Sequence, residues 1–148
     1  MERKIAILGA GSWGTAIALL AARNGCQTLL WGHNASHVAS IALDRENKRY
    51  LPNYPFPANI SLTADLKEVA NFSSVILVSV PSHAFKNTLT ELKSHLSEAE
   101  IKKIAWATKG FNPDDGYLLH EVVASLFGAE TPAAICPEPC FSAHSPLY

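Results

Sequence analysis

Residues 4–15 of the 148-residue chain read K-I-A-I-L-G-A-G-S-W-G-T, and they give the strongest indication of its fold. Lys4 to Leu8 is short and nearly all apolar, as expected for a strand that is covered on both faces. The G-x-G-x-x-G after it leads into an alanine- and leucine-rich segment, Ser12 to Arg23, which we predict to be a helix that ends at Asn24-Gly25. A strand, a glycine turn and a helix in this order are typical of the first unit of a dinucleotide-binding domain.

The three glycines of this motif have separate expected roles. Gly9 permits the tight turn after the strand, Gly11 lets the backbone approach a pyrophosphate, and Gly14 lets the helix pack closely on the strand. The unpaired amides at the start of the helix then face the phosphates, aided by the positive end of the helix dipole. We therefore predict a site for NAD or NADP at these glycines; the alternative is a glycine-rich turn that serves only packing.

The rest of the chain alternates β-branched runs with helical stretches. The predicted strands are Thr28 to Trp31, Ile60 to Leu62, Val75 to Val80, Ile104 to Thr108 and Ala133 to Ile135. The predicted helices are Ser36 to Lys48, with Asn34 or Ser36 as its cap, Asp65 to Ala70, Ser82 to about Leu96, capped by Ser82, and Tyr117 to Phe127. Three prolines make Tyr50 to Pro57 a surface connection held down by its aromatic residues. This order predicts an α/β, Rossmann-type, doubly wound parallel sheet.

The composition excludes several classes of protein. Hydrophobic residues make up 48% and charged residues 17%, which excludes intrinsic disorder. With 12 basic and 13 acidic residues the chain has no broad basic footprint for nucleic acid or an anionic membrane. Apolar runs such as Val75 to Val78 are far shorter than the roughly 20 residues of a spanning helix. Three cysteines without framework spacing fit a reducing compartment, so we expect a cytoplasmic globular protein.

The end of the second predicted strand is where the adenosine ribose is expected. NAD-specific sites usually carry Asp or Glu about 20 residues after the glycines, whereas this chain has Gly32-His33-Asn34. His33 can donate to a 2′-phosphate and become partly charged beside it, so the site admits NADP as well as NAD. No Arg lies in this short stretch, and strong selectivity is therefore not expected. The alternative for His33 is a solvated loop residue, and His37 is expected on a solvated helix face.

Two later strand ends face the same crevice, because ligands of such sheets lie at the carboxyl ends of the strands. One is Val80-Pro81-Ser82 and the other is Trp106 to Phe111. In the second, Lys109 can direct a point charge at a phosphate or at a developing alkoxide. Its alternative is an ordinary exposed lysine.

These stretches together resemble the amino-terminal domain of NAD(P)-dependent glycerol-3-phosphate dehydrogenase of the bacterial type. In family order they are G-A-G-S-W-G-T (9–15), W-G-H (31–33), N-K-R-Y-L-P (47–52), V-P-S (80–82) and W-A-T-K-G (106–110). The glycine loop alone is shared with many dehydrogenases, and its combination with V-P-S and A-T-K-G is much more specific. The resemblance implies that the cofactor is bound by Gly9, Gly11, Ser12, Trp13, Gly14, His33, Tyr50 and Lys109, the last of which would also bind the substrate.

The same resemblance implies a reaction. It is reversible hydride transfer between NAD(P)H and dihydroxyacetone phosphate or glycerol 3-phosphate, and its product feeds glycerophospholipid synthesis. The family's second, mostly helical domain supplies the catalytic lysine and is absent here, so we assign no catalytic residue to this chain. The full-length family also admits a homodimer.

The resemblance ends near residue 135, so we divide the chain into a dinucleotide-binding domain, 1–135, and a divergent proline-containing tail, 136–148. In the tail P-E-P-C-F-S (137–142) stands where the family has S-G-P-[ST]-F-A. The hypothesis is a truncated or frame-damaged product that is inactive alone. Cys136, Cys140 and His144 recur every four residues, but the prolines between them prevent a helix and we expect no metal site.

Two other functions remain open. The chain could be a free-standing dinucleotide-binding module that senses redox state, which would bind its cofactor alone. It could also belong to another two-domain dehydrogenase that acts on hydroxy acids or sugar acids. The W-A-T-K-G stretch argues against the second alternative.

Overall fold

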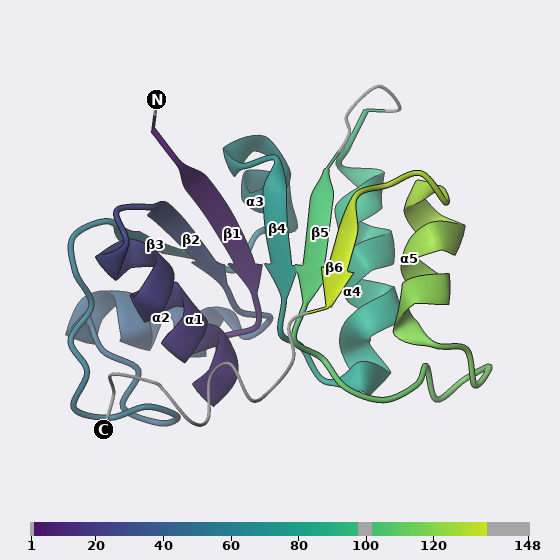
Figure 1. Cartoon of the computed structure of the whole chain (residues 1–148). Helices are drawn as coiled ribbons and strands as arrows, with labels where there is room; N and C mark the ends of the chain where they lie inside the picture. The colour runs from purple at the N-terminus through teal and green to yellow at the C-terminus, as the bar shows by residue number, and fades with distance from the viewer. Residues whose placement is uncertain (1, 98–101, 136–148) are drawn as a thin grey trace.

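Six strands form one parallel sheet in the order β3-β2-β1-β4-β5-β6 in a computed structural model that describes residues 2–97 and 102–135 (Figure 1). The strands are β1 (Lys4–Leu8), β2 (Gln27–Trp31), β3 (Ile60–Thr63), β4 (Val75–Val78), β5 (Lys103–Trp106) and β6 (Ala133–Ile135). The helices are α1 (Ser12–Arg23), α2 (Ala35–Asp44), α3 (Leu66–Phe72), α4 (Ser82–Ser94) and α5 (Leu119–Phe127). The predicted doubly wound α/β fold is confirmed.

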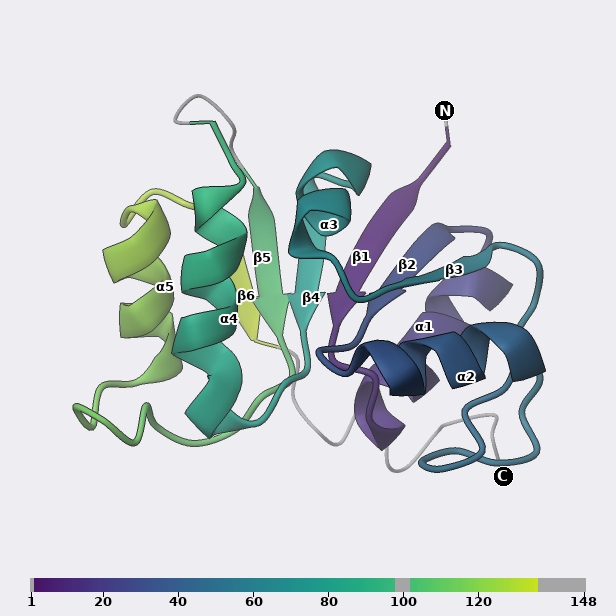
Figure 2. The same cartoon turned by 180° about the vertical axis from the view of Figure 1, so that it is seen from behind.

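Helices cover both faces of this sheet, as the two opposite views show (Figures 1 and 2). α1 packs on one face with Ile7, Leu30 and Leu77, and Ile41 of α2 joins this cluster. α3, α4 and α5 pack on the other face, where the sheet contributes alternate residues such as Ala6, Leu8, Ile76 and Ile104. Successive residues of β1 are therefore buried on opposite sides, which explains why the strand is almost wholly apolar.

The strand order reverses between β1 and β4. β1 pairs with β2 on one side and with β4 on the other, and the helices that follow β1 and β4 lie on opposite faces. The connections therefore diverge at the carboxyl ends of these two strands and leave a crevice there. In open α/β sheets this reversal is the usual place for a ligand.

Several element ends differ from the predictions because long-range contacts set them. α2 ends at Asp44 rather than Lys48, since Arg45 takes a left-handed conformation (φ 51°) and its guanidinium donates to the carbonyls of Pro57 at 2.7 Å and Ile60 at 2.9 Å. β4 ends at Val78 rather than Val80, and β5 at Trp106 rather than Thr108.

The start of α5 and the cap of α4 also differ from the predictions. α5 begins at Leu119 rather than Tyr117, and the N-cap of α4 is Pro81, so the predicted cap by the Ser82 side chain was wrong. Asn34 is the N-cap of α2, and its side chain accepts from the His37 amide at 3.1 Å. Of the two predicted caps, Asn34 and Ser36, the first is therefore confirmed.

No helix within residues 2–97 and 102–135 is long and apolar enough to cross a membrane. The proposed tail, 136–148, lies outside the described residues, and so do Cys136, Cys140 and His144. Among the described residues no group of three His, Cys, Asp or Glu side chains could hold a metal ion.

Candidate functional site

A cleft of about 770 Å³ lies at the carboxyl ends of the strands, where the strand order reverses. Its walls are formed by the glycine loop after β1, the turn after β2 with the first turn of α2, residues 49–50, the segment after β4 and the loop after β5. The predicted site residues that line it are Gly9, Gly11, Ser12, Trp13, His33, Tyr50 and Lys109. Gly14 lies beneath the loop and does not line the cleft.

Close backbone contacts fix the shape of the glycine loop. Gly9 has φ +116°, and a Cβ at this position would lie 2.7 Å from the carbonyl oxygen of Ser79. A Cβ on Gly14 would overlap the carbonyl oxygen of Gly9. The expected turn role of Gly9 and the packing role of Gly14 are therefore confirmed as properties of the fold.

Gly11 has a different environment. It is the N-cap of α1 with φ −84° and ψ −167°, and a Cβ built on it meets no atom of the described residues within 4 Å. The first turn of α1 carries no acidic residue, so no carboxylate of this turn offsets the positive end of the helix dipole. An anion can therefore approach the amides at the start of α1 directly over Gly11.

Residues 45–51 fold back onto the glycine loop and are held there by Asn47. This side chain is fully buried, and its Nδ2 donates to the carbonyl oxygen of Ala10 at 3.0 Å and to Oγ1 of Thr15 at 2.8 Å. Its Oδ1 accepts from the Tyr50 amide at 3.3 Å. A further bond joins the two segments directly, because the Ser12 hydroxyl donates to the carbonyl oxygen of Tyr50 at 2.9 Å. Asn47 is thus a structural residue of the site that our sequence analysis missed.

Replacing Asn47 by Ala should lower the free energy of unfolding by about 2 kcal/mol, because it leaves buried acceptors at Ala10 and Thr15 without their donor. Urea unfolding followed by Trp fluorescence measures this change. Asn71→Ala is the matched control, since Asn71 is exposed and its side chain donates to a carbonyl of its own helix. Equal losses in the two variants would contradict the assigned role of Asn47.

His37 and Arg49 also reach the cleft, which the sequence did not predict. His37 is half-buried and not on a solvated face: its ring meets that of Tyr50 edge-on, with centroids 5.3 Å apart, and its Nε2 lies 3.2 Å from Oδ1 of Asn47. The Tyr50 ring has a second contact, with Arg49, whose guanidinium carbon lies 5.1 Å from the centre of the ring. The cleft therefore has an arginine although the turn after β2 has none.

The charge of the cleft suits an anionic ligand. Among the described residues that line it, none is Asp or Glu, while Arg49 and Lys109 are both present. His33 and Lys109 are exposed on its walls. Two phosphates of a dinucleotide would thus meet helix amides and cations and no carboxylate, which is the chemical test that a pyrophosphate site must pass.

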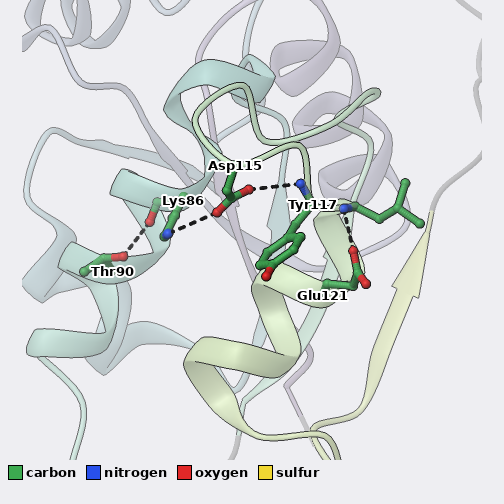
Figure 3. Close-up of polar contacts among 6 residues, drawn as sticks. Lys86, Thr90, Asp115, Tyr117 and Glu121 are labelled. Carbon is green, nitrogen blue, oxygen red and sulfur yellow. Dashed lines mark hydrogen bonds and ion pairs between the residues drawn. The ribbon is translucent and has the colours of Figure 1, made fainter.

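The loop that carries Lys109 is tied to its neighbours at both ends. Thr108 Oγ1 donates to the carbonyl oxygen of Val80 at 2.6 Å, which joins the ends of β5 and β4. Farther along, Asp115 accepts from the Tyr117 amide at 3.0 Å and from Lys86 Nζ of α4 at 3.5 Å (Figure 3). The loop is therefore braced against α4 before α5 begins.

The Tyr117 amide, which donates to the Asp115 carboxylate, lowers the pKa of Asp115 below its ordinary value, and Lys86 acts in the same direction. A lowered pKa means that the folded state favours the ionised carboxylate, so this stabilisation is present above the unfolded pKa and is lost as the pH falls through the folded one. Asp115→Ala should therefore lower the unfolding midpoint in urea by a small, constant amount between pH 5 and 8, and by less as the pH falls below about 4. Asp114→Ala, at the adjacent exposed carboxylate, is the control. If the urea midpoints of Asp115→Ala and wild type differed more as the pH falls, this assignment would be contradicted.

The chain matches, over residues 4–141, the family model described as NAD-dependent glycerol-3-phosphate dehydrogenase N-terminus. It is 48% identical over 138 residues to the glycerol-3-phosphate dehydrogenase [NAD(P)+] of Aeromonas hydrophila, covering 93% of this chain and 41% of that protein. With the protein of the same name from Colwellia psychrerythraea it shares 48% identity over 142 residues, covering 96% of this chain and 42% of that one.

One solved structure is also similar to this chain over most of its length. The crystal structure of glycerol-3-phosphate dehydrogenase from Coxiella burnetii superposes with a TM-score of 0.83 at 45% identity, covering 90% of this chain and 40% of that chain. This chain therefore spans about two fifths of the length of the proteins that it matches.

Proposed function

The chain belongs to the family of NAD-dependent glycerol-3-phosphate dehydrogenase amino-terminal domains, and from that premise we propose that its cleft binds NAD(P)(H) for hydride transfer. The observation that supports the proposal is the cleft at the strand-order reversal. There a helix N-terminus without a side-chain cap and two cations lie in a lining that, among the described residues, holds no carboxylate. When bound, NAD(P)H supplies the hydride or NAD(P)+ accepts it.

In this proposal each predicted residue has a physical role. The amides of Ser12 and Trp13, next to Gly11, hold the pyrophosphate. Gly9 and Gly14 let the loop lie close to the strand ends, so that the pyrophosphate can approach these amides. His33 and Tyr50 bound the adenosine end of the cleft, which is nearest α2. These roles are supported by position on the cleft walls and by the match of the family model to this whole region.

Lys109 is proposed to bind phosphate groups at the opposite end of the cleft, after β5. It follows β5, whose carboxyl end faces the crevice, and its ammonium can attract both a cofactor phosphate and the phosphate of a bound triose. The proposed substrate pair is dihydroxyacetone phosphate and glycerol 3-phosphate, in keeping with the names of the relatives. The groups that move protons in that reaction are not assigned to this chain.

Several wider proposals rest on the same family membership. We propose that residues 1–135 are the cofactor domain, that the product of the whole protein feeds glycerophospholipid synthesis, and that the protein works in the cytoplasm. A homodimer of the full-length protein is also a proposal. The two rival functions, a redox sensor and another two-domain dehydrogenase, are not favoured, because the relatives at 48% identity carry the glycerol-3-phosphate dehydrogenase name.

A fluorescence titration of the 148-residue chain with NADPH and with NADH tests the proposed binding. Trp13 is 38% exposed on the glycine loop, so its emission should be quenched saturably when either cofactor fills the cleft. The control is Trp13→Phe, in which most of the quenching should vanish while calorimetry still detects binding. A cooperatively folded chain that gives neither quenching nor heat at millimolar cofactor would overturn the proposal.

A further inference from the structure

We propose that the Arg49 guanidinium binds the adenosine 2′-phosphate of NADP(H) and gives this cleft a preference for NADP(H) over NAD(H). The inference rests on the proposed function, because it requires a dinucleotide in the cleft. It assigns the choice of cofactor to a residue of the folded-back segment, 45–51, and not to the turn after β2 alone.

The adenosine end of the cleft is open to a phosphate. NAD-specific sites place a carboxylate on the ribose 2′-hydroxyl, and such a carboxylate would repel a 2′-phosphate. Here the turn after β2 offers His33 and Asn34, and no described residue that lines the cleft is Asp or Glu. A 2′-phosphate would therefore meet no carboxylate of the described cleft lining, and a permanent cation is what it needs in addition.

Arg49 is the arginine that lies at this end. It lines the cleft and also an adjoining smaller hollow of about 350 Å³ along α2. Asn34 and His37 line both of these spaces too, which places Arg49 beside the turn after β2. Lys109, by contrast, follows β5 and lines the cleft but not the smaller hollow. The two cations are thus divided between the ribose side and the β5 side of the site.

The guanidinium of Arg49 is available for a ligand. Two carboxylates lie near it on the wall of the smaller hollow, but Asp44 pairs with Lys48 at 3.6 Å and Glu46 accepts from the Asn53 amide at 3.1 Å. Within residues 2–97 and 102–135, Arg49 has no carboxylate partner. Because a guanidinium presents five donors in a planar fork, it can bind a phosphate through two bonds at once.

Arg49 is also held in place before any ligand arrives. Its guanidinium stacks against the Tyr50 ring, which in turn meets the ring of His37. The Tyr50 carbonyl accepts from the Ser12 hydroxyl, so this stack is fixed relative to the glycine loop. A cation that is stacked and anchored loses less conformational entropy on binding than a free surface side chain.

Calorimetric dissociation constants of wild type, Arg49→Ala and Arg49→Lys for NADPH and NADH test this assignment. In Arg49→Ala the dissociation constant for NADPH should rise about 10- to 100-fold, the range for lost bonds to a charged group, while that for NADH changes less than about 2-fold. Arg49→Lys should fall between wild type and Arg49→Ala, because it keeps the charge and loses the planar fork. Lys48→Ala is the matched control: it removes the adjacent cation, which faces Asp44, and should leave both constants within about 2-fold.

Equal weakening of NADPH and NADH in Arg49→Ala would overturn the inference, since Arg49 would then contact a part that both cofactors share. Unchanged binding of both would overturn it as well. If the wild-type chain binds neither cofactor, the proposed function fails instead, which is a distinct result. Arg49 is exposed, so its variants should keep the wild-type melting temperature. Should Arg49→Ala melt early, the ratio of the two constants in Arg49→Lys still decides the question.

Discussion

Replacing Gly11 by Asp is expected to abolish binding of NADPH and NADH while the chain keeps its fold. The backbone of Gly11 (φ −84°) suits any residue, and its missing Cβ would meet no atom of the described residues within 4 Å. Asp is moreover a better N-cap than Gly by a few tenths of a kcal/mol, so the melting temperature should hold or rise slightly. The new carboxylate, however, stands over the amides where the pyrophosphate must lie.

The loss should be at least about 100-fold in the dissociation constant, because two like charges placed against each other cost several kcal/mol. Gly11→Ala separates the two causes: it adds the Cβ without the charge and should weaken binding much less. Isothermal calorimetry at constant salt gives both constants. An Asp variant that binds within about 3-fold of wild type would mean that phosphates do not approach over Gly11.

Replacing Gly14 by Ala should have the largest effect on stability. Helix propensity alone predicts a gain of about 1 kcal/mol, since Ala is the better helix former. The contact with the Gly9 carbonyl oxygen opposes it, because the added methyl would overlap a backbone atom that has no rotamer to change. To relieve the overlap, α1 must move away from β1, and with it the buried contacts of Ile17 and Ala18.

We expect the cost of overpacking to exceed the gain in helix propensity, with a net loss of about 3 kcal/mol in the free energy of unfolding. Gly11→Ala is again the matched control, since it adds the same methyl group three positions earlier into open space and should cost less than about 1 kcal/mol. Urea unfolding at pH 7 measures both variants. A Gly14→Ala chain as stable as wild type would contradict the close contact between α1 and the end of β1.

How much of the fold could be predicted depends on whether its signals are local. β1 and α1 have the predicted bounds, because an apolar run, the glycine motif and Asn24-Gly25 lie next to each other in the sequence. The end of α2 was wrong because Arg45 leaves the helix to donate to carbonyls of Pro57 and Ile60, which no window around α2 reveals.

The same distinction holds for the site. Gly9, Gly11, His33 and Lys109 could be placed on the cleft from sequence, since each follows a strand and parallel strands end at one edge. Asn47 and Arg49 depend instead on the return of residues 45–51 over the glycine loop, and His37 of α2 contacts that segment through Tyr50 and Asn47. That return is fixed by buried bonds from Asn47, and a single asparagine gives no sign of its burial in the sequence.

A ¹H–¹⁵N correlation spectrum of the chain titrated with NADPH, followed residue by residue, tests the proposed cofactor site most sharply. We expect the amides of Gly11, Ser12 and Trp13 and the side-chain Nε of Arg49 to shift together and to saturate at one dissociation constant. Saturable shifts confined to residues away from the cleft, with the glycine-loop amides unmoved, would contradict it.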